Sequence, residues 1–150
     1  MNRYYYFNSI DKFKTSSSEE ILGILVQNND FSLEFPQRDA WRKEISILKD
    51  VLVKFDGSIS FEYSIPRMGK RIDVILLIGP IIFILEFKIG EDHFSTYAID
   101  QVWDYALDLK NFHESSHTHL IVPILIATES NAPDITIATT PQNDQILILF

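Results

Sequence analysis

Two acidic residues and a lysine are the residues best suited to chemistry in this chain. Asp73, Glu86 and Lys88 each lie in an apolar segment whose composition is typical of a β-strand. Two carboxylates supply the hard oxygen ligands that magnesium or manganese takes more readily than zinc does. Lys88 projects to the same face as Glu86, where an ammonium could orient a metal-bound water and offset charge at a reacting phosphorus. The three residues therefore predict a hydrolytic site.

The spacing of these residues predicts that they meet across a hairpin. A turn at 79–80, a glycine followed by a proline, pairs residues whose numbers sum to 159, so Asp73 lies opposite Glu86 and Arg71 opposite Lys88. Like charges directly opposite are destabilising unless a cation lies between them, which favours a divalent metal ion. The alternative is a surface hairpin in which Arg71 partly neutralises the acids.

Three more residues fall on helical segments that could reach the same site. Glu44 interrupts the apolar stripe of a helix expected at 36–55, where it either finds a partner at the site or reaches solvent. Gln101 and Tyr105 are four residues apart on a helix expected at 95–112, so they share one helical face. For Tyr105, packing in the core is the alternative.

The elements that must position these residues alternate in type along the chain. Apolar residues at steps of three and four predict the two long helices, and serines followed by acids at 16–20 predict the start of a short helix. Runs rich in β-branched residues predict strands at 59–64, 71–78, 81–89, 120–127, 135–139 and 145–150. This order indicates an α/β fold in which helices flank a mixed β-sheet.

Composition limits the class of protein. A length of 150 residues predicts one domain, and 46% hydrophobic residues indicates a folded chain. The absence of cysteine excludes disulfides, thiolate nucleophiles and cysteine zinc sites, and favours a cytoplasmic location. No signal peptide or run of about 18 apolar residues is present, so we expect neither secretion nor a membrane partner. His113, His117 and His119 lie at a helix end and in a polar turn, which disfavours a zinc site.

The charge of the chain restricts how it could meet nucleic acid. Thirteen basic and 21 acidic residues give a net charge of −8, whereas domains that bind phosphate backbones usually carry a basic face. A nucleic-acid partner would therefore need a local patch, and the candidate is the cluster Arg67, Lys70 and Arg71. The alternative is that these residues form an ordinary solvated surface.

The order of these residues resembles the PD-(D/E)xK nuclease superfamily. Glu44, Asp73, Glu86 with Lys88, and the pair Gln101 and Tyr105 follow its pattern, and the last pair is typical of the branch with a Gln-x-x-x-Tyr motif, seen in recombination exonucleases. Segments 61–67, 71–74, 85–90 and 101–113 look like the N-terminal part of certain bacterial proteins of unknown function in which a helicase-like ATPase region follows. The resemblance covers residues 37–128.

The resemblance implies a restriction-endonuclease-like fold and a division of roles. Asp73, Glu86, the backbone carbonyl of Phe87 and Glu44 would hold Mg²⁺ or Mn²⁺, and Lys88 would assist the water. Gln101 and Tyr105 would position the lysine or the substrate phosphate. The proline that usually precedes the first aspartate is replaced by Ile72, and no phosphate loop occurs in the chain, so an ATPase would belong to sequence beyond it.

The sequence thus predicts a metal-dependent nuclease domain that acts on nucleic acid, with DNA favoured over RNA. We expect residues 1–36 to form an N-terminal extension with a short helix and residues 37–150 to form the nuclease-like domain. Because the chain ends in an apolar run at 146–150, we expect it to be a piece of a longer protein. Two rivals remain: a non-catalytic module that binds nucleic acid or a partner through the same fold, and an acidic interaction domain unrelated to nucleic acid.

Overall fold

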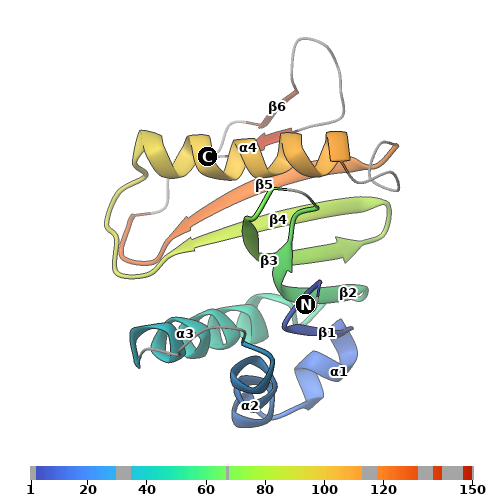
Figure 1. The fold of residues 1–150 in the computed structure, drawn as a ribbon, viewed down its shortest axis with the longest axis vertical. Coiled ribbons are helices and arrows are strands. Elements are labelled where there is room, and N and C mark those ends of the chain that lie inside the picture. The colour runs from blue at the N-terminus through green and yellow to red at the C-terminus, as the bar shows by residue number, and fades with distance from the viewer. Residues whose placement is uncertain are drawn as a thin grey trace.

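A computed structural model describes residues 3–29, 35–66, 68–112, 118–131, 137–139 and 147–149. The helices are α1 (Ile10–Thr15), α2 (Ser18–Asn28), α3 (Phe35–Val51) and α4 (Thr96–Phe112). The strands are β1 (Tyr6–Ser9), β2 (Ser58–Ser64), β3 (Arg71–Ile78), β4 (Ile81–Lys88), β5 (Leu120–Ala127), β6 (Ile137–Thr139) and β7 (Leu147–Leu149). Figure 1 shows one mixed sheet between two groups of helices, which confirms the predicted α/β class and is consistent with a restriction-endonuclease-like core.

The sheet is antiparallel in its first half and mixed in its second. Its strand order is β1-β2-β3-β4-β5-β7-β6, with antiparallel pairs up to β4 and a parallel pair between β4 and β5. The parallel pair requires a crossover, and α4 supplies it. Strands β3 and β4 pair in the predicted register, from Ile78 opposite Ile81 to Val74 opposite Leu85.

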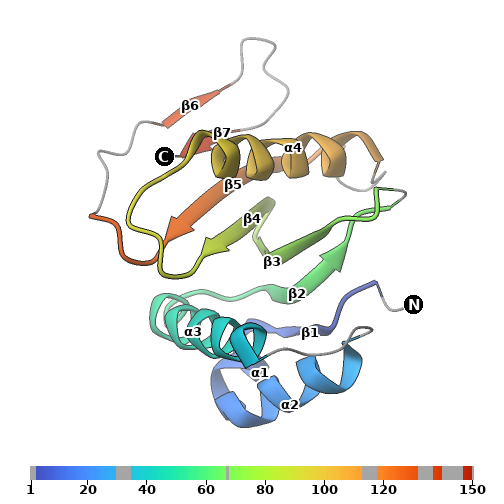
Figure 2. The same cartoon turned by 60° about the vertical axis from the view of Figure 1, so that its left-hand side comes forward.

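Helices cover both faces of the sheet (Figure 2). Along β4, Phe83 and Leu85 pack in a core cluster with α1, α2 and α3, whereas Ile82 and Ile84 pack in a second cluster with α4. Because alternate residues of a strand point to opposite faces, the two groups of helices lie on opposite sides of β4. Among the described helices, none has the length and apolar character needed to cross a membrane.

The N-terminal residues, predicted to be an extension, take part in the same sheet and the same core. Strand β1 pairs with β2, and Phe13 of α1 and Leu25 of α2 are fully buried in the cluster that contains α3. The predicted serine start of the short helix is confirmed, because the Ser17 hydroxyl accepts a hydrogen bond from the backbone N–H of Glu20. Residues 3–29 and α3 therefore support one another.

Candidate active site

The pairing of β3 with β4 changes at Asp73. The regular ladder runs to Val74 opposite Leu85, and at the next position Asp73 Oδ2 accepts a hydrogen bond of 2.8 Å from the backbone N–H of Phe87. A side-chain oxygen thus replaces a backbone acceptor of the neighbouring strand. Asp73 and Glu86 therefore come together at the end of the paired part of the hairpin, as the register predicts.

Strands β2 and β3 change the face that they present at the same point. In β3, Val74 packs in the cluster with α3 while Ile72 packs in the cluster with α4, and in β2 Phe61 and Tyr63 divide in the same way. Residues two apart in a regular strand share a face, so this switch needs a backbone irregularity. In β2, Glu62 supplies it, with a φ of 55° in the left-handed region that residues other than glycine rarely adopt.

A chain of hydrogen bonds links Lys88 to α4. Lys88 Nζ donates to Gln101 Oε1 over 2.8 Å, and Gln101 Nε2 donates to the Tyr105 hydroxyl over 2.8 Å. Lys88 Nζ also lies 3.5 Å from Glu86 Oε1. The predicted helical pair thus holds the lysine beside the acids, and Tyr105, although buried, has a polar partner as well as a packing role.

Two of the acidic side chains are buried with an unpartnered oxygen. Glu44 is 4% exposed and Glu86 is 5% exposed, and neither Oε2 atom has a hydrogen-bond partner. A buried polar atom without a partner is costly and marks a place where an ion or water is expected. Glu44 therefore does not reach solvent, which was one of its two predicted alternatives, but is buried close to the other acids.

Burial raises the pKa of every acid in this group. Burial and then the charge of Asp73 raise the pKa of Glu86 to about 8 and that of Glu62 to about 7, and the same causes hold the pKa of Glu44 well above its usual range. Burial also raises the pKa of Asp73, to about 6, against the opposing hydrogen bond from Phe87. Bringing these carboxylates to full charge therefore requires a positive partner.

The group has the chemistry of a divalent-cation site. All of its side-chain donors are carboxylate oxygens, which suit Mg²⁺ or Mn²⁺, and the unpartnered oxygens of Glu44 and Glu86 are the observation that favours an ion there. Asp73, Glu86, Glu44 and the carbonyl of Phe87 remain the predicted ligands. Within the described residues, no group of three or more acid or histidine side chains is already arranged to hold a metal ion.

The predicted basic patch is only partly described. Arg67 lies outside the described residues, and the 43% exposed side chain of Lys70 lies 3.8 Å from Asp108 Oδ2 on α4. Arg71 Nη1 donates to the backbone carbonyl of Glu62 over 2.6 Å, and its guanidinium lies 4.2 Å from the centre of the Tyr5 ring. The prediction that Arg71 shares a face of the sheet with Lys88 is wrong, because β3 changes the face that it presents between Arg71 and Asp73.

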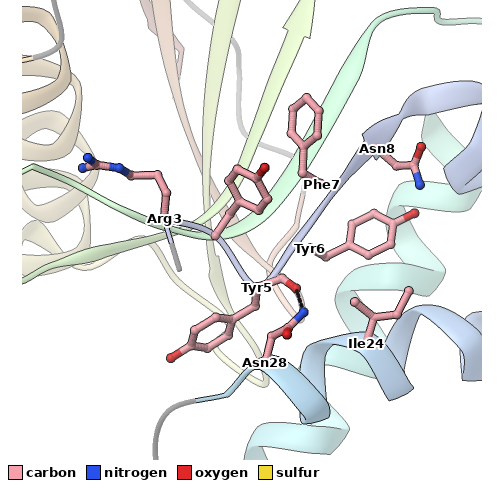
Figure 3. A pocket seen from close by; sticks show the side chains of 8 residues that line it. Arg3, Tyr5, Tyr6, Phe7, Asn8, Ile24 and Asn28 are labelled. Atoms are coloured by element: carbon pink, nitrogen blue, oxygen red, sulfur yellow. Dashed lines mark hydrogen bonds between the residues drawn. The ribbon is translucent and has the colours of Figure 1, made fainter. Parts of the chain in front are cut away.

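Two hollows lie near these elements. One, of about 460 Å³, adjoins the lysine–glutamine–tyrosine chain and is lined by Lys70, Tyr97, Asp100, Gln101, Asp104 and Tyr105. The other, of about 370 Å³, lies between β1 and α2, where Asn28 donates to the carbonyl of Tyr5 (Figure 3). Of these two hollows among the described residues, the one at α4 contains predicted site residues, so it is the candidate entrance for a substrate.

Glu62 is the member of the group that the sequence did not reveal. It lies between the pairs Phe61–Val74 and Tyr63–Ile72, so its register position is opposite Asp73. Its Oε1 accepts a hydrogen bond of 3.2 Å from the indole of Trp41. The sequence does show an acid between two aromatic residues in a predicted strand. The register of that strand against the next could not be predicted, because the loop at 65–70 joins the two strands.

Of the three histidines considered for zinc, only His119 lies within the described residues. His113 and His117 lie outside the described residues, and the backbone carbonyl of His119 accepts a hydrogen bond from Lys110 Nζ over 2.8 Å.

No family model, curated protein or solved structure matches the chain.

Proposed function

We propose that this chain is a metal-dependent nuclease domain that hydrolyses phosphodiester bonds. The observation that carries the proposal is the placement of Lys88 Nζ, 2.8 Å from Gln101 and 3.5 Å from Glu86, beside buried acids with unpartnered oxygens. An ion pair with a purely structural role would not need a second acid that has an oxygen without a hydrogen-bond partner. It would also not need an amide side chain that orients the lysine. A hydrolytic site that handles a polyanionic substrate needs both.

Each residue has a definite task in this proposal. Asp73, Glu86 and Glu44 would hold Mg²⁺ or Mn²⁺, which when bound supplies a Lewis acid and lowers the pKa of water. The Lys88 ammonium offsets the negative charge that develops at phosphorus, and it loses no free energy to reorientation because Gln101 already holds it. The pKa of Tyr105 is raised, chiefly by burial, to about 12, so its hydroxyl stays protonated and keeps the amide in place.

The substrate in this proposal is nucleic acid, and the resemblance favours DNA over RNA. The net charge of −8 opposes general binding to a polyanion, so the strand would enter at the hollow on α4, where Lys70 is half-exposed. A helicase-like ATPase region following this domain in a longer protein would supply further binding surface. The cytoplasm is the proposed location, because both nucleic acid and divalent cations are available there.

Cleavage of labelled DNA in Mg²⁺ or Mn²⁺ tests the proposal. We expect the wild-type chain to cleave single- or double-stranded DNA, and Asp73→Ala, Glu86→Ala and Lys88→Ala each to lower the rate by about a hundredfold or more. Glu20→Ala and Lys54→Ala, at exposed positions, are the matched controls and should keep full activity. Circular dichroism of every variant checks that the fold is retained.

The same assay separates the proposal from its rival. A chain that binds DNA without cleaving it in either cation would be a non-catalytic binding module. Cleavage that survives Lys88→Ala unchanged would remove the lysine from the mechanism. A chain that neither binds DNA nor responds to a divalent cation would instead fit the acidic interaction domain.

A further inference from the structure

Glu62 places a fourth carboxylate at the buried acidic group. It faces Asp73 across β2 and β3, at the position where both strands switch faces. Its negative charge raises the pKa of Glu44, and the charge of Asp73 raises that of Glu62. Glu62 therefore lies within electrostatic reach of acids on two other elements.

Helix α3 holds this carboxylate from the opposite side. Trp41, which is 1% exposed, lies three residues before Glu44, so the two side chains project from the same side of the helix. The Trp41 indole gives Glu62 Oε1 one neutral hydrogen bond of 3.2 Å. One neutral donor fixes the direction of a carboxylate but does not neutralise its charge.

The backbone of Glu62 is also held in an unfavourable conformation. A φ of 55° costs free energy for a residue with a side chain, and such conformations persist only where the surroundings enforce them. Arg71 enforces it by donating to the Glu62 carbonyl over 2.6 Å while its guanidinium rests on the ring of Tyr5. Tyr5 directly precedes β1 and also lines the N-terminal hollow in Figure 3.

The charges around the group do not balance. Among the residues that the structure describes, the basic groups facing the four acids are Lys88, which lies 3.5 Å from Glu86, and Arg71, which lowers the pKa of Glu62. Within this described set, two negative charges remain in excess when every group is ionised, which one divalent cation would neutralise. Independently of the charge count, Glu44 is nine-tenths buried and its Oε2 has no partner.

We propose that Glu62 is the fourth carboxylate of the divalent-cation site, positioned there by Trp41 and Arg71. This inference rests on the proposed function and extends it, because it adds a ligand that the motif does not contain. The change of face in β2 then turns the Glu62 side chain toward the cation. Trp41 becomes a positioning residue whose indole reports on the site.

Calorimetric titration with Mn²⁺ tests the inference without any measurement of activity. Glu62→Gln keeps the acceptor for the Trp41 indole but loses the charge, so we expect its affinity for Mn²⁺ to fall by about tenfold or more. Glu20→Gln, which makes the same change at an exposed position on α2, should bind as the wild type does. If Glu62→Gln does not fold, Glu62→Asp, with the charge on a shorter side chain, should bind more weakly than the wild type.

Tryptophan fluorescence gives a second readout. The chain has two tryptophans, so a Trp103→Phe background leaves Trp41 as the reporter. In this background Mn²⁺ should change the Trp41 emission, and in Glu62→Gln the same change should need about tenfold more Mn²⁺.

The outcomes separate this inference from the proposed function. Loss of Mn²⁺ binding in Asp73→Asn with unchanged binding in Glu62→Gln would overturn the role of Glu62 alone. A wild-type chain that binds no Mn²⁺ would overturn both. Weakened binding in both variants, with Glu20→Gln unaffected, is the result we expect.

Discussion

At the scale of single residues, the site depends on side chains that hold one another. Gln101 is the central connection, because its two amide atoms join Lys88 to Tyr105 over 2.8 Å each. An amide between an ammonium and a protonated phenol has only one orientation that satisfies both. The lysine is therefore aimed by residues that need not touch a substrate.

Replacing Tyr105 with phenylalanine tests this arrangement. Tyr105→Phe keeps the buried ring but leaves Gln101 Nε2 without its acceptor, so the lysine loses part of its alignment. We expect the rate of DNA cleavage at saturating substrate to fall by about tenfold with little change in KM. Tyr4→Phe, where the ring is 41% exposed and lies outside the hollow on α4, is the control and should behave as the wild type. Equal rates for both variants would contradict a positioning role for Tyr105.

At the scale of elements, α3 and α4 approach the site from different sides. Helix α3 brings Trp41 and Glu44, α4 brings Gln101 and Tyr105, and β3 meets both where Asp73 leaves the regular ladder. The two helices cover opposite faces of the sheet, so their residues could not meet without a break in the strands. The face switch of β2 and β3 provides that break.

Most of these elements could be predicted from the sequence because their patterns are local. The long helices follow from apolar periodicity, and the register of β3 and β4 follows from the short turn that joins them. Strand β1 was missed because four residues are too few to show a period, and its partner lies about fifty residues away.

The predicted site was incomplete for a different reason. Asp73, Glu86, Lys88 and the pair on α4 lie together because turn and helix geometry fix them locally. Glu62 depends on a left-handed backbone conformation, for which a glutamate gives no sequence signal, and on a six-residue loop that leaves the register of β2 open. The same switch sends Arg71 toward Tyr5 instead of the predicted basic patch.

The turn that enters β2 provides a test of the sheet itself. Gly57 has a φ of 145°, and a Cβ atom there would lie 2.0 Å from the carbonyl oxygen of Leu77 on β3. Gly57→Ala should therefore lower the free energy of unfolding by about 2 to 3 kcal/mol in urea denaturation. Gly23→Ala in α2 has open space around its Cβ and should raise it by about 0.5 to 1 kcal/mol. Equal effects of the two substitutions would contradict the close approach of Gly57 to β3.

At the scale of the whole molecule, buried acids couple stability to pH. The pKa values of Glu86, Glu62 and Asp73, at about 8, 7 and 6, lie above those of the unfolded chain, so the folded state binds more protons between about pH 4 and 8. The free energy of unfolding must then fall as the pH rises through this window.

Urea denaturation of the metal-free protein, in the presence of a chelator, checks how the free energy of unfolding depends on pH. We expect the free energy of unfolding to be lower at pH 8 than at pH 5, by an amount on the order of a few kcal/mol. Saturating Mn²⁺ should remove most of the difference, because a cation favours the ionised carboxylates. Stability that rises with pH in the chelated protein would show that the acids are not held protonated.

The central claim is that the buried acids share one cation, and thermal melts of wild type and Asp73→Asn with chelator and with Mn²⁺ test it most directly. Asparagine keeps an acceptor for the Phe87 N–H but relieves the repulsion, so the chelated variant should be more stable than wild type by about 1 kcal/mol. Mn²⁺ should raise the Tm of wild type much more than that of Asp73→Asn. A chelated variant less stable than wild type, with equal shifts on adding Mn²⁺, would contradict the claim.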